Sequence, residues 1–313
     1  MALTVEQISA VSYPAVLAEM RQAKNQWVQN SALNHLEKSG FIQHISFGEN
    51  IECPLDYRAN PDTAVLASDQ DSAALLKTEV VTSAVYDIAQ INVPVTWTRG
   101  DEAKNPSETQ KINLVKTLLT NAIDSHDDLI ETNIFVGSSA GGIETNGLDD
   151  LVPTTGQGTV GGIDASVETF WRNQADTFVD GSDIEVAMTE LYNACAKGTG
   201  GLAPTTLISG SATHALYEGQ LQSLQRFVDA SEADAGFKAL AFKGAKYIFS
   251  HKGGTSVYFL NPKNYQLVVS KQYFRDKGTT YDVPGQNANY FLVYSALQFV
   301  TNCKSRLGVL SQA

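Results

Sequence analysis

The hydrophobic positions change their spacing several times along the chain, and each change marks a predicted element. At the N-terminus, Thr4 and Gln7 have the capping-box spacing of a short helix, and Pro14 suits the first turn of a longer one. Apolar side chains then recur at helical intervals until Gly40, a residue type that often follows a helix. The pattern predicts a helical N-terminal arm over residues 1–46.

From residue 47 the apolar positions alternate with polar ones, which is the period of a half-buried strand. Two segments show this alternation, residues 51–57 and residues 91–97, and the stretch 59–78 between them is polar and rich in turn residues. We therefore expect these two strands to form an extended β-hairpin within residues 47–100. A hairpin with so little core of its own is marginal in water unless it lies on a neighbour.

A long helical face follows Pro106. Ser107 and Gln110 repeat the capping-box spacing, and apolar residues then hold one side of a helix as far as Phe135. At 1.5 Å per residue, a helix over residues 107–135 is about 40 Å long, which is unusual for a globular domain.

The next part of the chain alternates between helix and strand patterns. Ser182 or Asp183 is placed to cap a helix, residues 205–209 form an apolar run typical of a buried strand, and a second helix passes through Leu216. This order predicts an α/β subdomain over residues 179–256.

Strand patterns dominate the C-terminal part. Residues 237–249 and 257–269 are rich in apolar and aromatic side chains, and we expect Gly253-Gly254 to supply the positive φ of a tight hairpin between them. Pro262 ends a strand because it lacks the amide donor. Residues 290–300 predict a long strand that rejoins the sheet.

Composition limits the classes of function. The chain has 43% hydrophobic and 18% charged residues, which is typical of an ordered globular protein. Its formal net charge of −12 argues against binding nucleic acid through phosphates, which requires clustered Lys and Arg, but an acidic wall can still enclose nucleic acid. The N-terminus lacks the pattern of a signal peptide, and no apolar stretch approaches the ~20 residues of a membrane span. We expect a soluble protein made in the cytoplasm.

The three cysteines, Cys53, Cys195 and Cys303, lie far apart in the sequence. Their odd number and wide spacing exclude a disulfide framework and give no zinc motif. Free thiols in a reducing compartment are the better interpretation.

The segment Gly137-Ser-Ser139-Ala-Gly141 fits the G-x-S-x-G pattern of a nucleophile elbow. An elbow needs a strand before the serine and a helix after it, whereas here a long helix leads in and further glycines follow. His214 or His251 would have to serve as the base, and neither has a supporting pattern. We interpret the segment as a loop, with a serine hydrolase using Ser139 as a distant alternative.

The segment Gly156-Gln-Gly158-Thr-Val-Gly161 fits the G-x-G-x-x-G pattern of dinucleotide sites. That site needs a preceding strand and a helix that opens at the glycines, and the sequence predicts another loop instead. No cofactor is therefore expected.

Two further clusters have a structural interpretation. His126-Asp127-Asp128 cannot converge on one metal ion from adjacent helix positions, so we expect a solvated helix face. Phe170 and Trp171 resemble a stacking platform, but a buried anchor beneath a loop fits an acidic chain better. The sequence therefore predicts no catalytic residue, no cofactor-binding residue and no metal ligand.

Several segments resemble one family. They are the "Gly-phe…fLN…L" pattern within residues 237–269, the run Gly147-Leu-Asp-Asp-Leu-Val152, and the stretch from Thr159 to Asn173. In these segments, and in the order of its elements, the chain is similar to the major capsid proteins of tailed double-stranded DNA bacteriophages. The resemblance implies an α+β capsid fold with a helical arm, a long hairpin, a spine helix with a peripheral β-sheet, and an α/β axial domain. The implied parts are an N-terminal arm at 1–46, an extended hairpin at 47–100, a peripheral domain at 101–178 with the spine helix at 107–135, an axial domain at 179–256, and returning strands at 257–313.

This resemblance implies a structural function rather than an enzymatic one. Copies of the chain would form the pentamers and hexamers of an icosahedral shell around packaged viral DNA, which the shell encloses without specific binding. Ile51, Leu55, Val93 and Trp97 are the expected contacts between subunits. The arm is too short to include the scaffolding segment of some relatives, so the resemblance implies a separate scaffolding protein or a processed chain. Portal and decoration proteins are further expected partners.

Two points stay open at the level of the sequence. Some capsids of this fold join subunits through a lysine–asparagine isopeptide bond, and Lys77 is a candidate donor, although no asparagine or carboxylate can be matched to it. Bacterial encapsulating compartments use the same fold to hold an enzyme cargo, and only the contents would distinguish such a shell from a virion.

Overall fold

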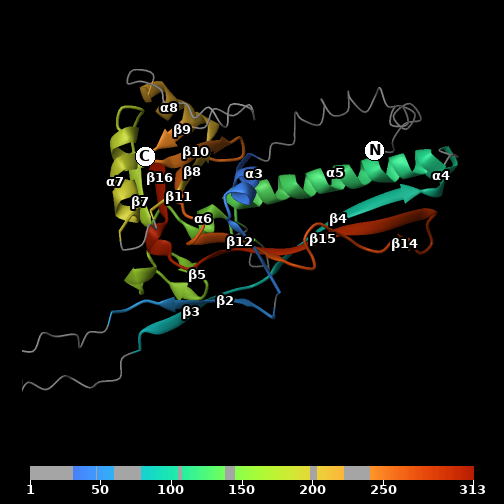
Figure 1. Ribbon diagram of the computed structural model, residues 1–313, viewed down its shortest axis with the longest axis horizontal. Coiled ribbons are helices and arrows are strands. Elements are labelled where there is room, and N and C mark those ends of the chain that lie inside the picture. Colours follow the sequence, from blue (N-terminus) through green and yellow to red (C-terminus); the bar gives the residue numbers. More distant parts are fainter. Residues whose placement is uncertain are drawn as a thin grey trace, which may run out of the picture.

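The computed structural model describes residues 31–46, 48–59, 79–104, 108–137, 145–197, 203–221 and 240–313. It shows an elongated molecule in which a rounded lobe carries helices α7 and α8, helix α5 extends away from the lobe, and the strands β2 and β3 lie along one side (Figure 1). The helical elements are α3 (Ser31–Lys38), α4 (Arg99–Lys104), α5 (Glu108–Phe135), α6 (Leu148–Leu151), α7 (Ile184–Cys195) and α8 (Ser211–Leu221), with 3-10 turns η1 (Thr169–Trp171) and η3 (Lys304–Arg306).

The first sheet, which we call the spine sheet, lies beside α5 (Figure 1). Its central strand is β15, which is long enough to pair with β12 at one end and with β13, β14 and β4 towards the other. Among the described residues its strands are β1 (Ile42–Ile45), β4 (Ala89–Thr98), β12 (Tyr265–Ser270), β13 (Asp276–Lys277), β14 (Tyr281–Asp282) and β15 (Ala288–Thr301).

Helix α5 covers one face of the spine sheet. Trp97 and Phe291 on the sheet meet edge to face, with ring centroids 5.8 Å apart, and pack with Ala122 of the helix. Along β4, more buried residues alternate with exposed ones, which is the pattern of a strand with one covered face. The predicted spine helix is thereby confirmed, and the apolar stripe that predicted it is what holds it on the sheet.

The second sheet, which we call the lobe sheet, has the order β7-β16-β11-β8-β10-β9. Its strands are β7 (Gln174–Phe178), β8 (Thr206–Gly210), β9 (Leu240–Phe242), β10 (Ala245–Ser250), β11 (Val257–Leu260) and β16 (Gly308–Gln312). Leu207 and Phe259 pack in the core that includes α7 and α8 residues, whereas Ile208 and Tyr258 on the same strands pack in the main core. The lobe sheet is therefore covered on both faces, and the main core joins it to the spine sheet.

The hairpin consists of β2 (Ile51–Asp56) and β3 (Val81–Tyr86). The prediction that residues 91–97 form the second strand of this hairpin was wrong. These residues lie in β4, which pairs with β15 from Ala89–Leu297 to Thr98–Ala288. Alternation shows which residues share a face but not which strand is the partner. The alternation along β4 reflects its contact with α5. The strand that forms the hairpin with β2 is the shorter strand β3.

The expected turn at Gly253-Gly254 was also wrong. Neither glycine has φ in the left-handed region, and the strands on either side, β10 and β11, both pair with β8 instead of with each other. The tight turn lies earlier, at Lys243 and Gly244, where φ values of 48° and 84° join β9 to β10.

Other predicted boundaries agree with the structure. Helix α7 begins directly after Asp183, β8 occupies the predicted buried run, and β11 ends just before Asn261-Pro262. Gly40, with φ of +77°, follows α3, so residues 31–38 of the predicted arm are helical as expected. The expectation of a helical arm up to residue 46 was wrong for its last part, because Ile42–Ile45 form β1 and pair in parallel with β12 of the spine sheet. The earlier part of that arm and the predicted hairpin tip lie outside the described residues. Two short strands, β5 (Thr159–Val160) and β6 (Ile163–Asp164), form a separate small hairpin.

Candidate subunit interface

The inward face of the β2–β3 hairpin is fixed to its own chain. Ile51 and Leu55 of β2 are each only 6% exposed, and they share the main core with Ala84 and Tyr86 of β3. The Tyr86 hydroxyl donates a hydrogen bond of 2.8 Å to the carbonyl oxygen of Thr301, and burial raises the pKa of this phenol. This face therefore holds the hairpin on the body.

The outward face of the hairpin has a different character. Val81 is 66% exposed and Val85 is 37% exposed. Across the strand pair, Val81 lies opposite Asp56 and Val85 lies opposite Glu52. Pro54 lies opposite Ser83 between these two pairs, so this face has two valines on one strand and two carboxylates on the other. Such a surface can bury apolar area while its charges select the partner.

The four residues predicted as contacts divide into two pairs at separate places. Ile51 and Leu55 lie in the hairpin root, whereas Val93 and Trp97 lie on β4 beneath α5, where the Trp97 Nε1–H donates to Glu102 Oε1 at 2.8 Å. The side chains of all four are mostly or partly buried within their own chain. A contact of these residues with a second subunit stays a prediction. Val81 and Val85, which sequence reasoning missed, are more exposed than these four residues. The sequence of residues 81–86, VTSAVY, does not alternate between apolar and polar residues, so no local pattern identified them.

A second exposed surface lies on the face of the spine sheet opposite α5. On β15, Phe291 and Val293 point towards the helix, so Leu292 between them points away and is 38% exposed. Tyr273 and Tyr281 are exposed as well, and they contact Tyr294 and Tyr290, with ring centroids 5.6 and 5.9 Å apart. We call these five residues, Tyr273, Tyr281, Tyr290, Leu292 and Tyr294, the uncovered sheet face.

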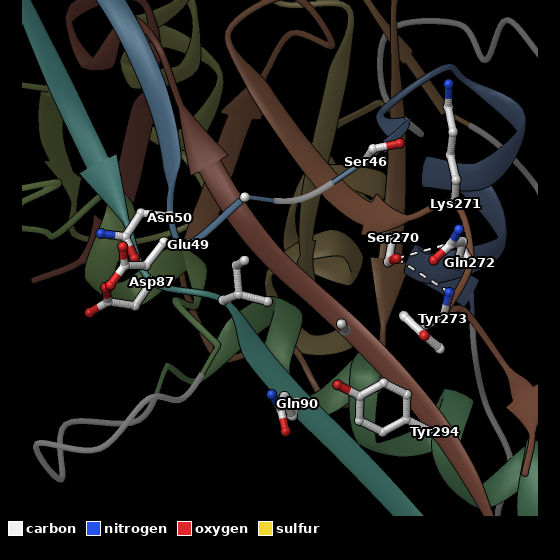
Figure 2. A pocket seen from close by; sticks show the side chains of 13 residues that line it. Ser46, Glu49, Asn50, Asp87, Gln90, Ser270, Lys271, Gln272, Tyr273 and Tyr294 are labelled. Atoms are coloured by element: carbon white, nitrogen blue, oxygen red, sulfur yellow. Dashed lines mark hydrogen bonds between the residues drawn. The ribbon is translucent and has the colours of Figure 1, made fainter.

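A hollow of about 570 Å³ adjoins this face at the root of the hairpin. Figure 2 shows Glu49 and Asp87 on one side of it and Tyr273 and Tyr294 on the other. The Ser270 hydroxyl accepts hydrogen bonds from the backbone N–H groups of Gln272 and Tyr273, and neither histidine nor cysteine lines the hollow.

Helix α5 has a polar junction near its C-terminal end. The buried carboxylate of Glu131 accepts hydrogen bonds from the backbone N–H groups of Ala32 (3.0 Å) and Leu33 (2.7 Å) and from the Ser250 hydroxyl (2.6 Å). The two amides belong to the first turn of α3, where helix N–H groups have no partner within the helix. Burial raises the pKa of Glu131 despite these donors. One side chain thus joins α3, α5 and β10.

Ion pairs surround this junction. Lys252 contacts Asp128 at 2.5 Å, and Arg275 donates to Asp127 at 2.8 Å and to Glu37 of α3 at 2.9 Å. The expectation of a solvated helix face around His126 was therefore wrong, because His126 is fully buried and its neighbours hold α3 and two loops on the helix. The sequence pattern gave no sign of the partners, which lie more than 100 residues away along the chain.

The remaining motifs have structural roles or lie elsewhere. Gly156, Gly158 and Gly161 occupy the turns around β5 and β6, so no helix opens at these glycines. Trp171 is buried as predicted. Ser139 and Lys77 lie outside the described residues, so the structure does not test the serine hydrolase alternative or the crosslinking lysine. Within the described residues, no group of three His, Cys, Asp or Glu side chains could hold a metal ion, and Cys53, Cys195 and Cys303 are free.

The helices of the described part of the chain include none that is long and apolar enough to cross a membrane.

Comparison with solved structures decides the fold. The chain is similar to a capsid subunit of cyanophage A-1(L), with a TM-score of 0.61 and 14% identity, over 91% of this chain and 93% of that one. It has the phage-capsid fold. Chains of a native GTA particle capsid match with a TM-score of 0.60 and 10% identity, over 89% of each chain. The predicted α+β capsid fold is confirmed. Neither a family model nor a curated protein matches the sequence.

The phage-capsid fold also occurs in a compartment protein. The chain is similar to the SrpI encapsulin of Synechococcus elongatus PCC 7942, with a TM-score of 0.57 and 12% identity, over 88% of this chain and 86% of that one. The fold is therefore shared with structures of a phage capsid and of an encapsulin complex.

Proposed function

We propose that this chain is a major capsid protein, a structural subunit that assembles with copies of itself into an icosahedral shell around packaged viral double-stranded DNA. The observation that carries the proposal is the agreement of fold with capsid subunits over about nine-tenths of both chains. The net charge of −12 suits a wall that encloses DNA without adhering to it. The work of such a protein is binding between subunits and not turnover.

The uncovered surfaces supply the binding. The outward hairpin face, with Val81 and Val85, projects from the body, and the uncovered sheet face exposes an aromatic and aliphatic surface on another side of the molecule. Burying apolar area is worth about 25 cal/mol per Å², so each contact is modest, but the contacts repeat around a closed shell. The hairpin would lie across a neighbouring copy, and Ile51, Leu55, Val93 and Trp97 would bury apolar area in contacts between subunits.

The remaining partners follow from the same proposal. Copies would form pentamers and hexamers, and a separate scaffolding protein, a portal and decoration proteins would complete the assembly. The chain would be made in the host cytoplasm and reside in the virion. No enzymatic step is required of it.

Negative-stain electron microscopy of the purified protein, with size-exclusion chromatography and light scattering, tests the proposal. We expect closed shells or rings of capsomer size. A species that stays monomeric or dimeric even with its scaffolding protein supplied would contradict the proposal. A variant in which residues 60–78 are replaced by a short linker should remain folded but assemble poorly, and normal shells from that variant would remove the role of the hairpin.

The similarity to encapsulin favours one second candidate, the shell of a protein compartment. Shells isolated from the native source would distinguish the two. A virion contains DNA, which nuclease treatment after disassembly would reveal, whereas a compartment contains a discrete protein cargo that appears as a second band on a denaturing gel.

A further inference from the structure

The β2–β3 hairpin is supported by the turn of the small β5–β6 hairpin. The backbone N–H of Val85 donates a hydrogen bond of 3.0 Å to the carbonyl oxygen of Gly161. The side chains of Ala84 and Tyr86, on either side of Val85, point to the buried face and therefore towards this turn. The two backbones are thus in direct contact.

Gly161 leaves no room between turn and strand. A Cβ atom at this position would lie 2.8 Å from the Cβ of Ala84 and 3.2 Å from the Cζ of Tyr86. Separations under 3.0 Å do not occur between real Cβ atoms, and Ala84 cannot move aside without its strand because its side chain has no rotatable length. The adjacent Gly162 has a similar positive φ, +78° against +59°, but a Cβ there would meet nothing within 4 Å.

The turn itself is held in place. The Nε1–H of the buried Trp171 donates to the carbonyl oxygen of Val160 at 3.0 Å. Further along the hairpin, the rings of Tyr57 and Phe170 lie 4.8 Å apart. The hairpin therefore rests on two supports that both belong to residues 158–171.

We propose that Gly161 is a positioning residue that sets the direction in which the hairpin leaves the body, and hence the ability of one subunit to reach the next. This inference rests on the proposed function. A two-stranded ribbon gains little stiffness from its own contacts, so its direction is set where it touches the body. A displacement at Ala84 is carried outward along strands that rise about 3.3 Å per residue.

The test compares Gly161→Ala with Gly162→Ala, because both place a side chain on a positive-φ backbone and only the first meets the hairpin. Hydrogen–deuterium exchange reports the position of the hairpin in the unassembled protein. We expect the Val85 amide to exchange at least about tenfold faster in Gly161→Ala, which corresponds to about 1.4 kcal/mol at 25 °C, and at the wild-type rate in Gly162→Ala. Assembly yield by light scattering should fall about tenfold in Gly161→Ala alone.

Each result has a distinct meaning. Equal Val85 exchange in the two variants would overturn the inference, whatever happens to assembly. Faster exchange in Gly161→Ala with unchanged assembly would also overturn it, because the direction of the hairpin would then not matter. Failure of the wild-type protein to assemble would contradict the proposed function. The exchange rates of Val85 in the two variants would still show whether Gly161 holds the hairpin in position. If Gly161→Ala is too unstable to purify, Gly161→Ser with Gly162→Ser in the presence of a stabilising osmolyte repeats the comparison.

Discussion

The two six-stranded sheets of the described structure differ in what covers them. The lobe sheet lies between α7 and α8 on one side and the main core on the other, and every residue of β8 and β11 is buried. The outer part of the spine sheet has α5 on one face and exposes the other. The lobe sheet is covered within its own chain, whereas the spine sheet and the hairpin each expose one face.

The amino-acid sequences of the strands show the same difference. The run Val257-Tyr-Phe-Leu260 is continuously apolar, which is the pattern of a strand buried on both faces. The segment Ala89–Thr98 alternates, which is the pattern of a strand with one wet or partner-facing side. Alternation in the sequence therefore marks the strands that leave one face uncovered in the described structure.

The largest effect on stability is expected when a side chain inside the lobe sheet is shortened. Phe259→Ala removes a fully buried ring, and we expect a loss of about 3–5 kcal/mol in the free energy of unfolding. Leu292→Ala on the uncovered sheet face is the matched control and should change it by less than about 1 kcal/mol. Urea denaturation followed by circular dichroism measures both. Similar losses in the two variants would mean that the two faces are not differently covered.

The next test concerns a buried charge, which is an exception among the apolar side chains of the covered region. Lys304 is fully buried, its Nζ has no hydrogen-bond partner in the described structure, and burial lowers its pKa to about 8. Below that pH both folded and unfolded chains are protonated and the burial penalty is complete. Between about 8 and its usual 10.4 the unfolded chain binds the extra proton, so stability should rise with pH.

Replacing this charge should therefore stabilise the protein. We expect Lys304→Met to raise the free energy of unfolding at pH 7 by on the order of 3 kcal/mol and to flatten the rise between pH 8 and 10. Lys271→Met at an exposed position should do neither. A loss of stability in Lys304→Met would show that the ammonium group has a partner that compensates its burial.

The polar junction that fastens α3 should give a smaller effect. Glu131→Gln places an amide N–H₂ group among three donors, and we expect a loss of about 1–3 kcal/mol in the free energy of unfolding. Exchange of the Ala32 and Leu33 amides should accelerate at the same time. Glu190→Gln, at an exposed position on α7, is the control and should change stability by less than about 0.5 kcal/mol.

The pH dependence of this variant has a definite sign. Because burial raises the pKa of Glu131, the folded chain retains its proton at pH values where the unfolded chain has lost it. This residue therefore makes stability fall as pH rises from the ordinary glutamate value of about 4.3 through its raised pKa. That fall should be absent in Glu131→Gln, and an unchanged pH profile would contradict the assignment.

The smallest effect on stability is expected on the outward hairpin face. Val81→Asp replaces an exposed side chain, so the free energy of unfolding should change by about 0.5 kcal/mol or less. Assembly measured by light scattering should nevertheless fall strongly, because a third carboxylate would join Asp56 and Glu52 on a face that we propose to be buried between subunits. Val81→Thr should assemble better than Val81→Asp, and equal assembly of wild type and both variants would remove this face from the interface.

Much of the fold could be predicted from the sequence because it depends on local periodicity. The spine helix, α7, β8 and β15 all follow from apolar spacing and capping residues. Pairing could not be predicted, since β2 and β4 both alternate and nothing local indicates that β3 is the true partner of β2. Glu131 lies beside Ile130 and Ile134 within the apolar stripe, and that position was the one available signal that its carboxylate is buried.

The path of the chain through the two sheets has a consequence for how they come apart. Strand β15 runs through the spine sheet and continues through η3 into β16 of the lobe sheet, while β11 and β12 are consecutive strands in different sheets. A single cut therefore cannot separate the molecule into two autonomous segments. Heating should therefore melt both sheets in one cooperative transition, with no stage at which one sheet has unfolded while the other persists.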